Sequence, residues 1–348
     1  MIIILSQECR LTQNRLDPHV ASVTRYFKKV GQDYLIFKRH HPKHFLSFQP
    51  QTSLDKPPRL TLQLDGALYE FKSKNSFTLW NRSKSYLDAE KNGQVGTVDQ
   101  KFRMLQWRQV INALESSSLC KGAVNTSLAN YHMDLKINQL NMAVGCGLTI
   151  PNTVISNDPD EILNLFNHCN QVIYKAFTPL VNEKGTLYAT IISASQIEHA
   201  RDSVGVAPGI YQEYIQKAYE LRVYVIGDQV IVVKIDSQQQ ALTKHDWRRG
   251  QSLPIFTKGA LSPTVERQLL NFHQQSGLAY AAYDFIVTLQ GQEIFLECNP
   301  GGQWLFVGNV LGEKISEALA SYLIEQDVTE ISASSKKRAV VKLCQHFN

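Results

Sequence analysis

The sequence of 348 residues has no long apolar run and no strong excess of one charge. Its longest apolar stretches, at residues 1–5 and 230–233, are far shorter than the ~20 residues that a membrane-spanning helix needs. Lys and Arg number 36 against 31 Asp and Glu, and a net charge of +5 is too small and diffuse to indicate a nucleic-acid-binding protein. We therefore expect a chain that neither spans a membrane nor binds nucleic acid.

The patterns of secreted and zinc-binding proteins are missing as well. The six cysteines are scattered without any C-x-x-C spacing, which argues against a zinc site and a disulfide scaffold. Residues 1–5 turn polar at once at Ser6, whereas a signal peptide needs a basic start and an apolar stretch of about 7 to 15 residues. A reducing, cytoplasmic location with free thiols is the expectation.

Several familiar site motifs are absent too. No G-x-x-x-x-G-K-[ST] occurs, and Gly145-x-Gly147 follows a predicted helix rather than a strand, so we interpret it as a helix C-cap and not a dinucleotide fingerprint. No Ser-His-Asp or Cys-His set stands out, and the ten histidines are expected to be structural or solvated. The basic segment KRHHPKH at 38–44 would suit a polyanion or a metal, but is more typical of a solvated loop.

Periodicity and length predict an α/β chain of three units, since a domain averages roughly 100–200 residues. Residues 1–115 begin β-α-β, with strands at 2–5 and 34–37, which implies a parallel sheet. The central unit covers 116–210, the third covers 211–330, and 331–348 form a tail. Other expected elements are a helix over 133–144, strands over 172–177, 187–192 and 212–215, and a polar connector over 193–209.

Three oxygen-bearing side chains are expected to meet on one hairpin near the carboxyl end. Asp284 lies in the strand YDFIV, and Glu297 and Asn299 are two apart on its partner, so they share a face that can lie opposite Asp284. Such a set without His or thiolate suits Mg²⁺, which takes carboxylates and fills its shell with phosphate oxygens and water. The alternative is a half-buried strand whose polar face simply meets solvent.

A phosphate ligand would also need cations. Lys175 stands in the apolar strand VIYKAF, where an ammonium costs several kcal/mol of desolvation unless it reaches water or an anion. A lysine that snorkels from an edge strand is the competing explanation. Lys136, Arg222 and Arg248 likewise lie next to apolar or aromatic residues, and the four cations together could surround a polyphosphate.

The order of these residues resembles the ATP-grasp carboxylate ligases. Lys136, Lys175, the segment 212–215 and Glu220 precede Asp284, Glu297 and Asn299, as in that superfamily. Within it, four segments look like the microviridin-type peptide ligases, the graspetide synthetases: ELRVYVIGD at 220–228, IDSQ at 235–238, DWRRG at 246–250 and ECNPGGQWLF at 297–306. The resemblance covers about residues 120–325, and the first 115 residues match only in kind.

The resemblance implies a three-domain ATP-grasp fold with ATP bound between the central and third domains. It implies that Lys136 and Lys175 hold the ATP phosphates, and that Glu220 binds the ribose hydroxyls. Two Mg²⁺ ions would be held by Asp284, Glu297 and Asn299. Arg222 and Arg248 would stabilise the transferred phosphoryl group and the substrate carboxylate, and the hairpin around Gly185 would be a lid. The main chain offered to adenine would come from Gln212, Glu213, Tyr214 and Ile215.

The implied reaction joins side chains of a ribosomally made precursor peptide. An Asp or Glu carboxylate is phosphorylated by ATP, and a Ser or Thr hydroxyl or a Lys amine then displaces phosphate to form an ester or amide. The implied partner is that precursor, with a core rich in acids and hydroxyls and a leader helix docked on the central domain. Residues 193–209 are a candidate region for the leader, with a solvated connector as the alternative. A homodimer is also expected. Two alternatives remain: an ATP-grasp ligase that adds an amino acid such as glutamate to a terminus, and a binding module without turnover.

Overall fold

The computed structural model describes most of the chain, in two compact units. The described residues are 1–6, 16–39, 41–53, 55–72, 77–82, 97–177, 181–182, 185–186, 189–239, 243, 247–250 and 253–328. The first unit comprises Met1–Ser83, Ile111–Val124 and Leu319–Asn348, and the second comprises Lys84–Val110 and Asn125–Ala318. Helices α3 (Val98–Ser116) and α10 (Asn309–Val328) contribute residues to both.

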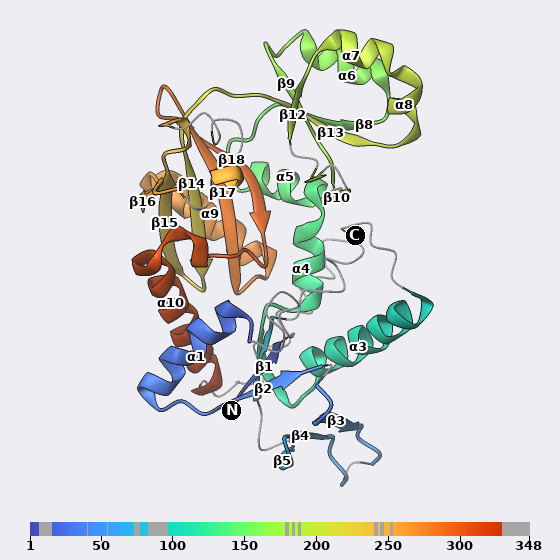
Figure 1. Ribbon diagram of the computed structural model, residues 1–348, viewed down its shortest axis with the longest axis vertical. Helices are drawn as coiled ribbons and strands as arrows, with labels where there is room; N and C mark the ends of the chain where they lie inside the picture. The colour runs from blue at the N-terminus through green and yellow to red at the C-terminus, as the bar shows by residue number, and fades with distance from the viewer. Residues whose placement is uncertain are drawn as a thin grey trace. The chain divides into compact units, whose positions relative to one another are not determined.

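A parallel sheet forms the core of the first unit (Figure 1). Its order is β2 (Tyr34–Lys38), β1 (Ile2–Ser6), β6 (Phe77–Asn81), β7 (Cys120–Val124). Every residue of β1 is buried, as in strands covered on both faces. Helix α1 (Pro18–Val30) connects β1 to β2; it begins at Asp17, whose side chain accepts the His19 N–H, and ends at Gly31 with φ 73°. The expected β-α-β start is confirmed.

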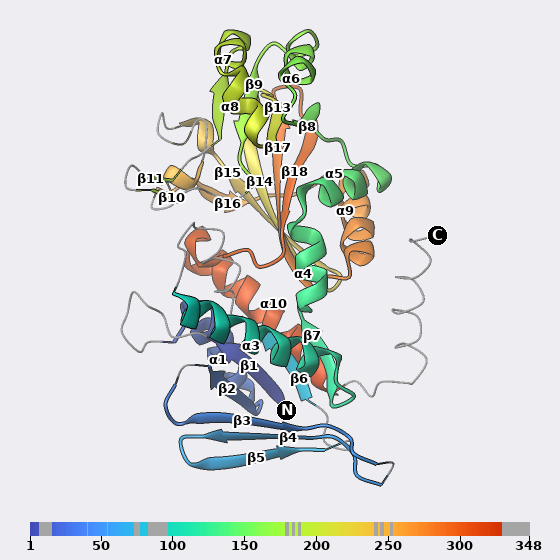
Figure 2. The ribbon, with the colours of Figure 1, turned by 90° about the vertical axis from the view of Figure 1, so that its right-hand side faces the viewer.

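Three antiparallel strands form the other sheet of this unit and lie side by side in Figure 2. They are β3 (His44–Gln49), β4 (Arg59–Leu64) and β5 (Ala67–Phe71). The turn between β4 and β5 places Asp65 at φ 49° and Gly66 at φ 93°, and such a pair of positive φ angles is typical of a tight hairpin turn.

The smaller sheet of the second unit is antiparallel. Its order is β12 (Thr190–Ile192), β9 (Val172–Lys175), β13 (Gly209–Glu213), β8 (Thr153–Ser156). Helices α6 (Pro159–Phe166), α7 (Ala194–His199) and α8 (Arg201–Val206) lie along one side of it in Figure 1. Between β9 and β12, β10 (Val181–Asn182) pairs with β11 (Gly185–Thr186) as a short hairpin.

The larger sheet of this unit carries the predicted acids. Its order is β16 (Phe256–Lys258), β15 (Gln229–Ile235), β14 (Lys217–Ile226), β17 (Tyr280–Thr288), β18 (Glu293–Asn299). β17 is buried along its whole length. Helices α4 (Ser127–Asp134), α5 (Lys136–Gly145) and α9 (Pro263–Ser276) pack apolar residues against β14, β17 and β18. Short 3₁₀ helices occur at Ser237–Gln239, Trp247–Gly250 and Leu305–Val307.

The expected helix and connector are wrong, and two expected strands are present with different bounds. The helix expected over 133–144 is two helices, because Leu135 adopts an extended conformation (φ −76°, ψ 106°) between them. The strand expected over 212–215 is Gly209–Glu213, which pairs with both β8 and β9. The expected strand 172–177 ends at Lys175, and the connector over 193–209 contains α7 and α8. For the strand expected over 187–192, the described part is Thr190–Ile192.

Other expectations concern parts that the structure does not describe. The tail 331–348 and Asp246 of the DWRRG segment lie outside the described residues. Within the described ranges, no helix combines the length and the apolar character that crossing a membrane requires.

Candidate functional site

Asp284, Glu297 and Asn299 come together on the β17–β18 hairpin. The strands pair Asp284 with Glu297 and Ala282 with Asn299, and the register shifts between Asp284 and Phe285. This irregularity leaves Leu296 without an opposite residue, so the acids lie beside a β-bulge, a feature common near active sites. Asp284 is only 5% exposed although it carries a carboxylate. The expected convergence of these three side chains is what the structure has.

Two oxygens of this group face the same donors. The Asn299 Nδ2 lies 3.2 Å from Asp284 Oδ2 and 3.2 Å from Glu297 Oε1. One Arg248 nitrogen, Nη2, donates to the same two oxygens at 3.0 and 2.9 Å. The two carboxylates therefore point at one common position, which a cationic group occupies.

Arg222 and Lys136 neutralise the acids from other directions. Arg222 on β14 faces Asp284 across the sheet, and its Nη1 donates to Asp284 Oδ1 at 2.7 Å with both side chains buried. Lys136 is the first residue of α5, and its Nζ donates to Glu297 Oε2 at 2.9 Å. The break of the helix at Leu135 is thus what brings Lys136 to the acids.

The pKa values of the two carboxyl groups shift in opposite directions because their neighbours differ. Burial raises the pKa of Asp284, and the charges of Arg222 and Arg248 only partly offset it. Burial also acts to raise the pKa of Glu297, but Lys136 and Arg248 outweigh it, so this pKa lies well below its usual range. Glu297 is therefore the more firmly ionised of the two.

Lys175 lies at the end of β9, and its Nζ donates to Gln212 Oε1 at 2.6 Å. Burial lowers its pKa to about 8, although the charge of Glu297 acts in the other direction. Gln212 is itself fixed by Thr153, whose hydroxyl accepts from Gln212 Nε2 at 2.9 Å. The contact with Gln212 places the half-buried Lys175 ammonium beside a neutral acceptor, an environment that a bound anion would make more favourable.

The remaining predicted nucleotide residues lie around the end of β13 and the start of β14. Glu220 is buried and pairs with Lys217 at 2.8 Å; burial raises its pKa in spite of that lysine. Tyr214 and Ile215 follow β13. The N–H groups of Glu213 and Tyr214 donate to the carbonyls of Asn152 and Gln171. The contact between adenine and the main chain of 212–215 stays a prediction. Because these two N–H groups already have partners, it concerns the remaining main-chain groups of the segment.

Gly302 in the NPGGQW segment permits the close packing of Arg222. A Cβ at this position would overlap Ala282 Cβ and would lie 2.8 Å from Arg222 Nη2. The carbonyl of Gly302 accepts from Tyr280 Oη at 2.6 Å, which holds the segment against β17. Its neighbour Trp304 is fully buried, with its Nε1 donating to Ser316 at 2.8 Å. This motif therefore shapes the wall beside Asp284.

Trp247 anchors the residue that bridges the acids. Its ring is 3% exposed and packs against Phe256 and Phe306, with ring centroids 6.0 and 5.0 Å away. The Arg248 guanidinium lies 5.3 Å from the same ring. A buried neighbour thus fixes the start of the Arg248 side chain, although that side chain is 41% exposed.

The donor set fits Mg²⁺. It consists of two carboxylates and an amide with no nitrogen or sulfur ligand, and the carboxylate oxygens converge on one position now filled by a guanidinium nitrogen. A 180° turn of the Asn299 amide would direct its oxygen to the same position. Asp284, Glu297 and Asn299 are therefore the residues that would hold the metal.

Three further residues, not predicted from the sequence, contact Glu220 or the backbone around the metal ligands. Lys217 is the partner of Glu220, three residues away, and this spacing was its only signal. Gln139 and Asn125 are buried amides that bond to the backbone around β17 and β18. Gln139 lies three residues after Lys136 on the same helix, a spacing that does not by itself distinguish it from other residues of α5.

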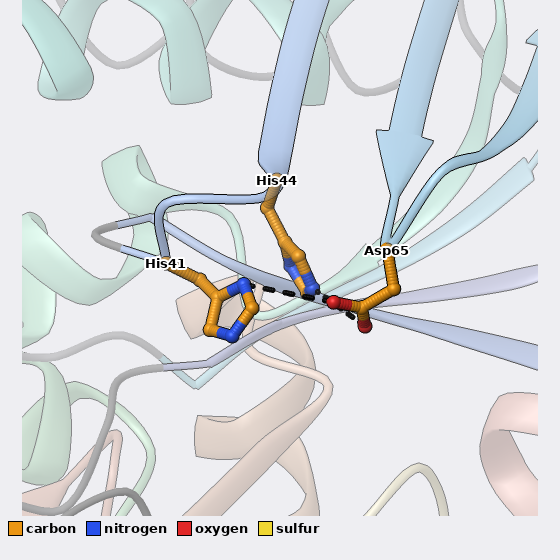
Figure 3. Close-up of side chains that lie close together, drawn as sticks. All are labelled: His41, His44 and Asp65. Carbon is orange, nitrogen blue, oxygen red and sulfur yellow. Dashed lines mark hydrogen bonds and ion pairs between the residues drawn. The ribbon is translucent and has the colours of Figure 1, made fainter.

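A second cluster lies in the first unit, where His41, His44 and Asp65 come together (Figure 3). His44 Nε2 lies 3.3 Å from Asp65 Oδ2, and its Nδ1 accepts the Lys38 N–H at 3.1 Å. Burial lowers the pKa of His44, and the neutral ring carries its proton on Nε2, where Asp65 accepts it. The His44 Nε2 is therefore used in a hydrogen bond to Asp65. His44 begins β3 with a buried ring, so the expected solvated loop is wrong at this end of the basic segment.

No protein-family model and no curated protein matches the sequence, but solved structures match it over almost its whole length. A RiPP-associated ATP-grasp ligase of Chryseobacterium gregarium, in complex with ADP and a leader and core peptide, is 23% identical with a TM-score of 0.78, covering 95% of this chain and 100% of that one. The macrocyclase MdnC of Microcystis aeruginosa MRC, bound with precursor peptide MdnA, is 23% identical with a TM-score of 0.73, covering 93% and 100%.

A third similar structure is the ATP-grasp ligase PsnB, complexed with minimal precursor, Mg and ADP. It is 20% identical with a TM-score of 0.67, covering 94% of this chain and 98% of that one. Likeness at these identities and over these lengths concerns the backbone fold. The chain has the ATP-grasp fold.

Proposed function

We propose that this chain is an ATP-dependent ligase that crosslinks side chains of a ribosomally made precursor peptide. The observation that carries the proposal is the meeting of Lys136, Arg222 and Arg248 with Asp284 and Glu297 on an ATP-grasp fold. Similar structures hold ADP, Mg and precursor peptides, which supports the same ligands here. Phosphoryl transfer depends mainly on positioning and charge neutralisation, and these residues supply both.

Each charged residue has a task in this proposal. Lys175 binds ATP phosphate in place of Gln212, and Lys136 turns from Glu297 to the phosphates. Glu220 accepts from the ribose hydroxyls. Mg²⁺, held by Asp284, Glu297 and Asn299, would polarise the phosphates and offset their charge. Arg248 would turn from the two carboxylates toward the transferred phosphoryl group and the substrate carboxylate.

The proposed reaction has two steps. An oxygen of a peptide Asp or Glu carboxylate attacks the γ-phosphorus, the bond to the β-phosphate oxygen breaks, and ADP leaves. A Ser or Thr hydroxyl or a Lys amine attacks the carbonyl of the resulting acyl phosphate. Phosphate departs with one former carboxylate oxygen, the nucleophile loses its proton, and an ester or amide remains. No nucleophile on the protein is required, because the peptide supplies both reacting groups.

The precursor would contribute a leader segment as well as a core. A hollow of about 400 Å³ lies beside the edge strand β12, between α6 and the start of α7. Phe166, Ile191 and Ile192 supply its apolar lining, and Ile191 is 37% exposed. An amphipathic leader helix fits such a surface through its apolar face. A homodimer and a cytoplasmic location are further parts of the proposal, the first measurable by sedimentation.

Co-expression with a candidate precursor, a short peptide rich in Thr, Asp and Glu whose reading frame would be sought beside this gene, tests the function. We expect the peptide to lose the mass of one water molecule for each crosslink. A gain of the mass of an added amino acid would instead support the terminus-modifying ligase, and an unchanged peptide mass with intact ATP would support a binding module. Either result would refute the crosslinking proposal.

A further inference from the structure

β18 is an edge strand that carries two of the proposed metal ligands. Its inner neighbour is β17, and no strand among the described residues pairs with its other side. The register irregularity beside Asp284 also interrupts the ladder next to Glu297. An edge strand with an interrupted ladder does not by itself fix the direction of its side chains, so other contacts must do so.

Gln139 supplies such a contact at Cys298, the residue between the two ligands. The Cys298 N–H donates to Gln139 Oε1 at 3.0 Å, and Gln139 Nε2 donates to the Cys298 carbonyl at 2.8 Å. The side-chain amide therefore pairs with the peptide groups of Cys298 as a neighbouring strand would. A second outer contact comes from Phe295, whose N–H donates to the Thr149 carbonyl at 2.8 Å.

The Gln139 amide is itself fixed. The residue is 0% exposed, and its Nε2 also donates to the carbonyl of Met133 at the end of α4. Both N–H groups and the oxygen are thus used, and the reversed amide would place a donor against the Cys298 N–H. Buried polar groups satisfied in this way hold one geometry, since every alternative leaves a donor or acceptor without a partner.

We infer that Gln139 is a positioning residue that aims Glu297 and Asn299 at their shared metal. Glu297 and Asn299 flank Cys298 and share the opposite face of the strand, so pinning the Cys298 peptide sets both ligand directions. Lys136, one turn earlier on α5, contacts Glu297 itself. One helix therefore holds both the backbone and a side chain of the ligand segment. The inference rests on the proposed function, because it assumes that these acids bind metal.

The experiment is Mn²⁺ binding to the full-length protein in the presence of ADP, followed by electron paramagnetic resonance, together with the unfolding temperature. Gln139→Met keeps the side-chain volume and removes all three hydrogen bonds. We expect it to weaken Mn²⁺ binding roughly tenfold or more, as removal of outer partners of metal ligands typically does. Ser276→Ala is the matched control: it removes a buried hydroxyl that bonds to His273 and Leu278, and should not change Mn²⁺ affinity.

Glu297→Gln separates failure of this inference from failure of the proposed function. If Glu297→Gln weakens Mn²⁺ binding and Gln139→Met does not, the positioning role is refuted and the metal site stands. If neither variant nor ADP alters Mn²⁺ binding, the proposed function fails as well. Should Gln139→Met not fold, Gln139→Glu keeps the acceptor for the Cys298 N–H, loses the donors, and must still weaken Mn²⁺ binding.

Discussion

Asp284 and Glu297 belong to one proposed metal site, yet neutralising them should affect stability very differently. Asp284→Asn leaves the Arg222 guanidinium buried without its counter-ion, since the two side chains are only 7% and 6% exposed. Breaking such a buried pair costs about 3 kcal/mol, the lower end of the usual range, because Asn also removes the buried charge whose desolvation raises the pKa of Asp284. Glu297→Gln weakens two partly exposed ion pairs, with Lys136 (23% exposed) and Arg248 (41% exposed), which together should cost about 1 kcal/mol.

The assay is thermal unfolding of the ligand-free protein by calorimetry. For a unit of this size, each kcal/mol corresponds to roughly 2–4 °C, so Asp284→Asn should lower the midpoint by roughly 6–12 °C and Glu297→Gln by roughly 2–4 °C. Both should abolish ATP-dependent product formation. Asp99→Asn, which breaks an exposed pair with Arg103, is the control and should change little. An equal or larger effect of Glu297→Gln would refute the assignment of Arg222 and Asp284 as the buried pair.

Three further perturbations test other parts of the site. Lys175 binds its proton less tightly when folded, with a pKa of about 8 against 10.5, so its charge destabilises the fold below pH 8 and this penalty vanishes as pH rises to 10.5. Lys175→Met should therefore raise the unfolding temperature at pH 7 but not at pH 10.5, while weakening ADP binding; a lower midpoint at pH 7 would contradict the burial argument. Gly302→Ala should displace Arg222 or Ala282, lower stability by about 2 kcal/mol or more, and reduce turnover in a rate assay; wild-type stability would show that the wall can relax. Ile191→Glu should weaken binding of the leader peptide at least tenfold in a titration while the unfolding temperature stays unchanged, and unaltered affinity would rule out the hollow beside β12.

Local sequence signals predicted the hairpin that carries the acids because its two strands are adjacent in the chain. Strand periodicity placed Glu297 and Asn299 on one face, and the short turn fixed Asp284 opposite. The β-bulge beside these residues was not predictable, because neither strand shows an extra residue by itself. The first β-α-β unit was predictable for the same local reason, since Asp17 and Pro18 mark the start of α1.

The supports of the site depend on contacts between distant segments. Gln139 meets Cys298 across 159 positions, and nothing in the helical pattern of α5 distinguishes it from another core residue. The break at Leu135 also escaped prediction, because Leu favours a helix and the apolar spacing continues through it. For Lys175 the sequence left open a snorkelling role, and the half-buried contact with Gln212 favours a role toward an anion.

The most direct test of the central claim follows the oxygen of the peptide carboxylate. The purified protein is given ATP, Mg²⁺ and the precursor peptide that it crosslinks, with the Asp and Glu carboxylates labelled with oxygen-18, and the released phosphate is analysed by mass spectrometry. Activation as an acyl phosphate predicts one labelled oxygen in phosphate for each crosslink formed, in step with ADP. Crosslinked peptide accompanied by unlabelled phosphate would contradict the account.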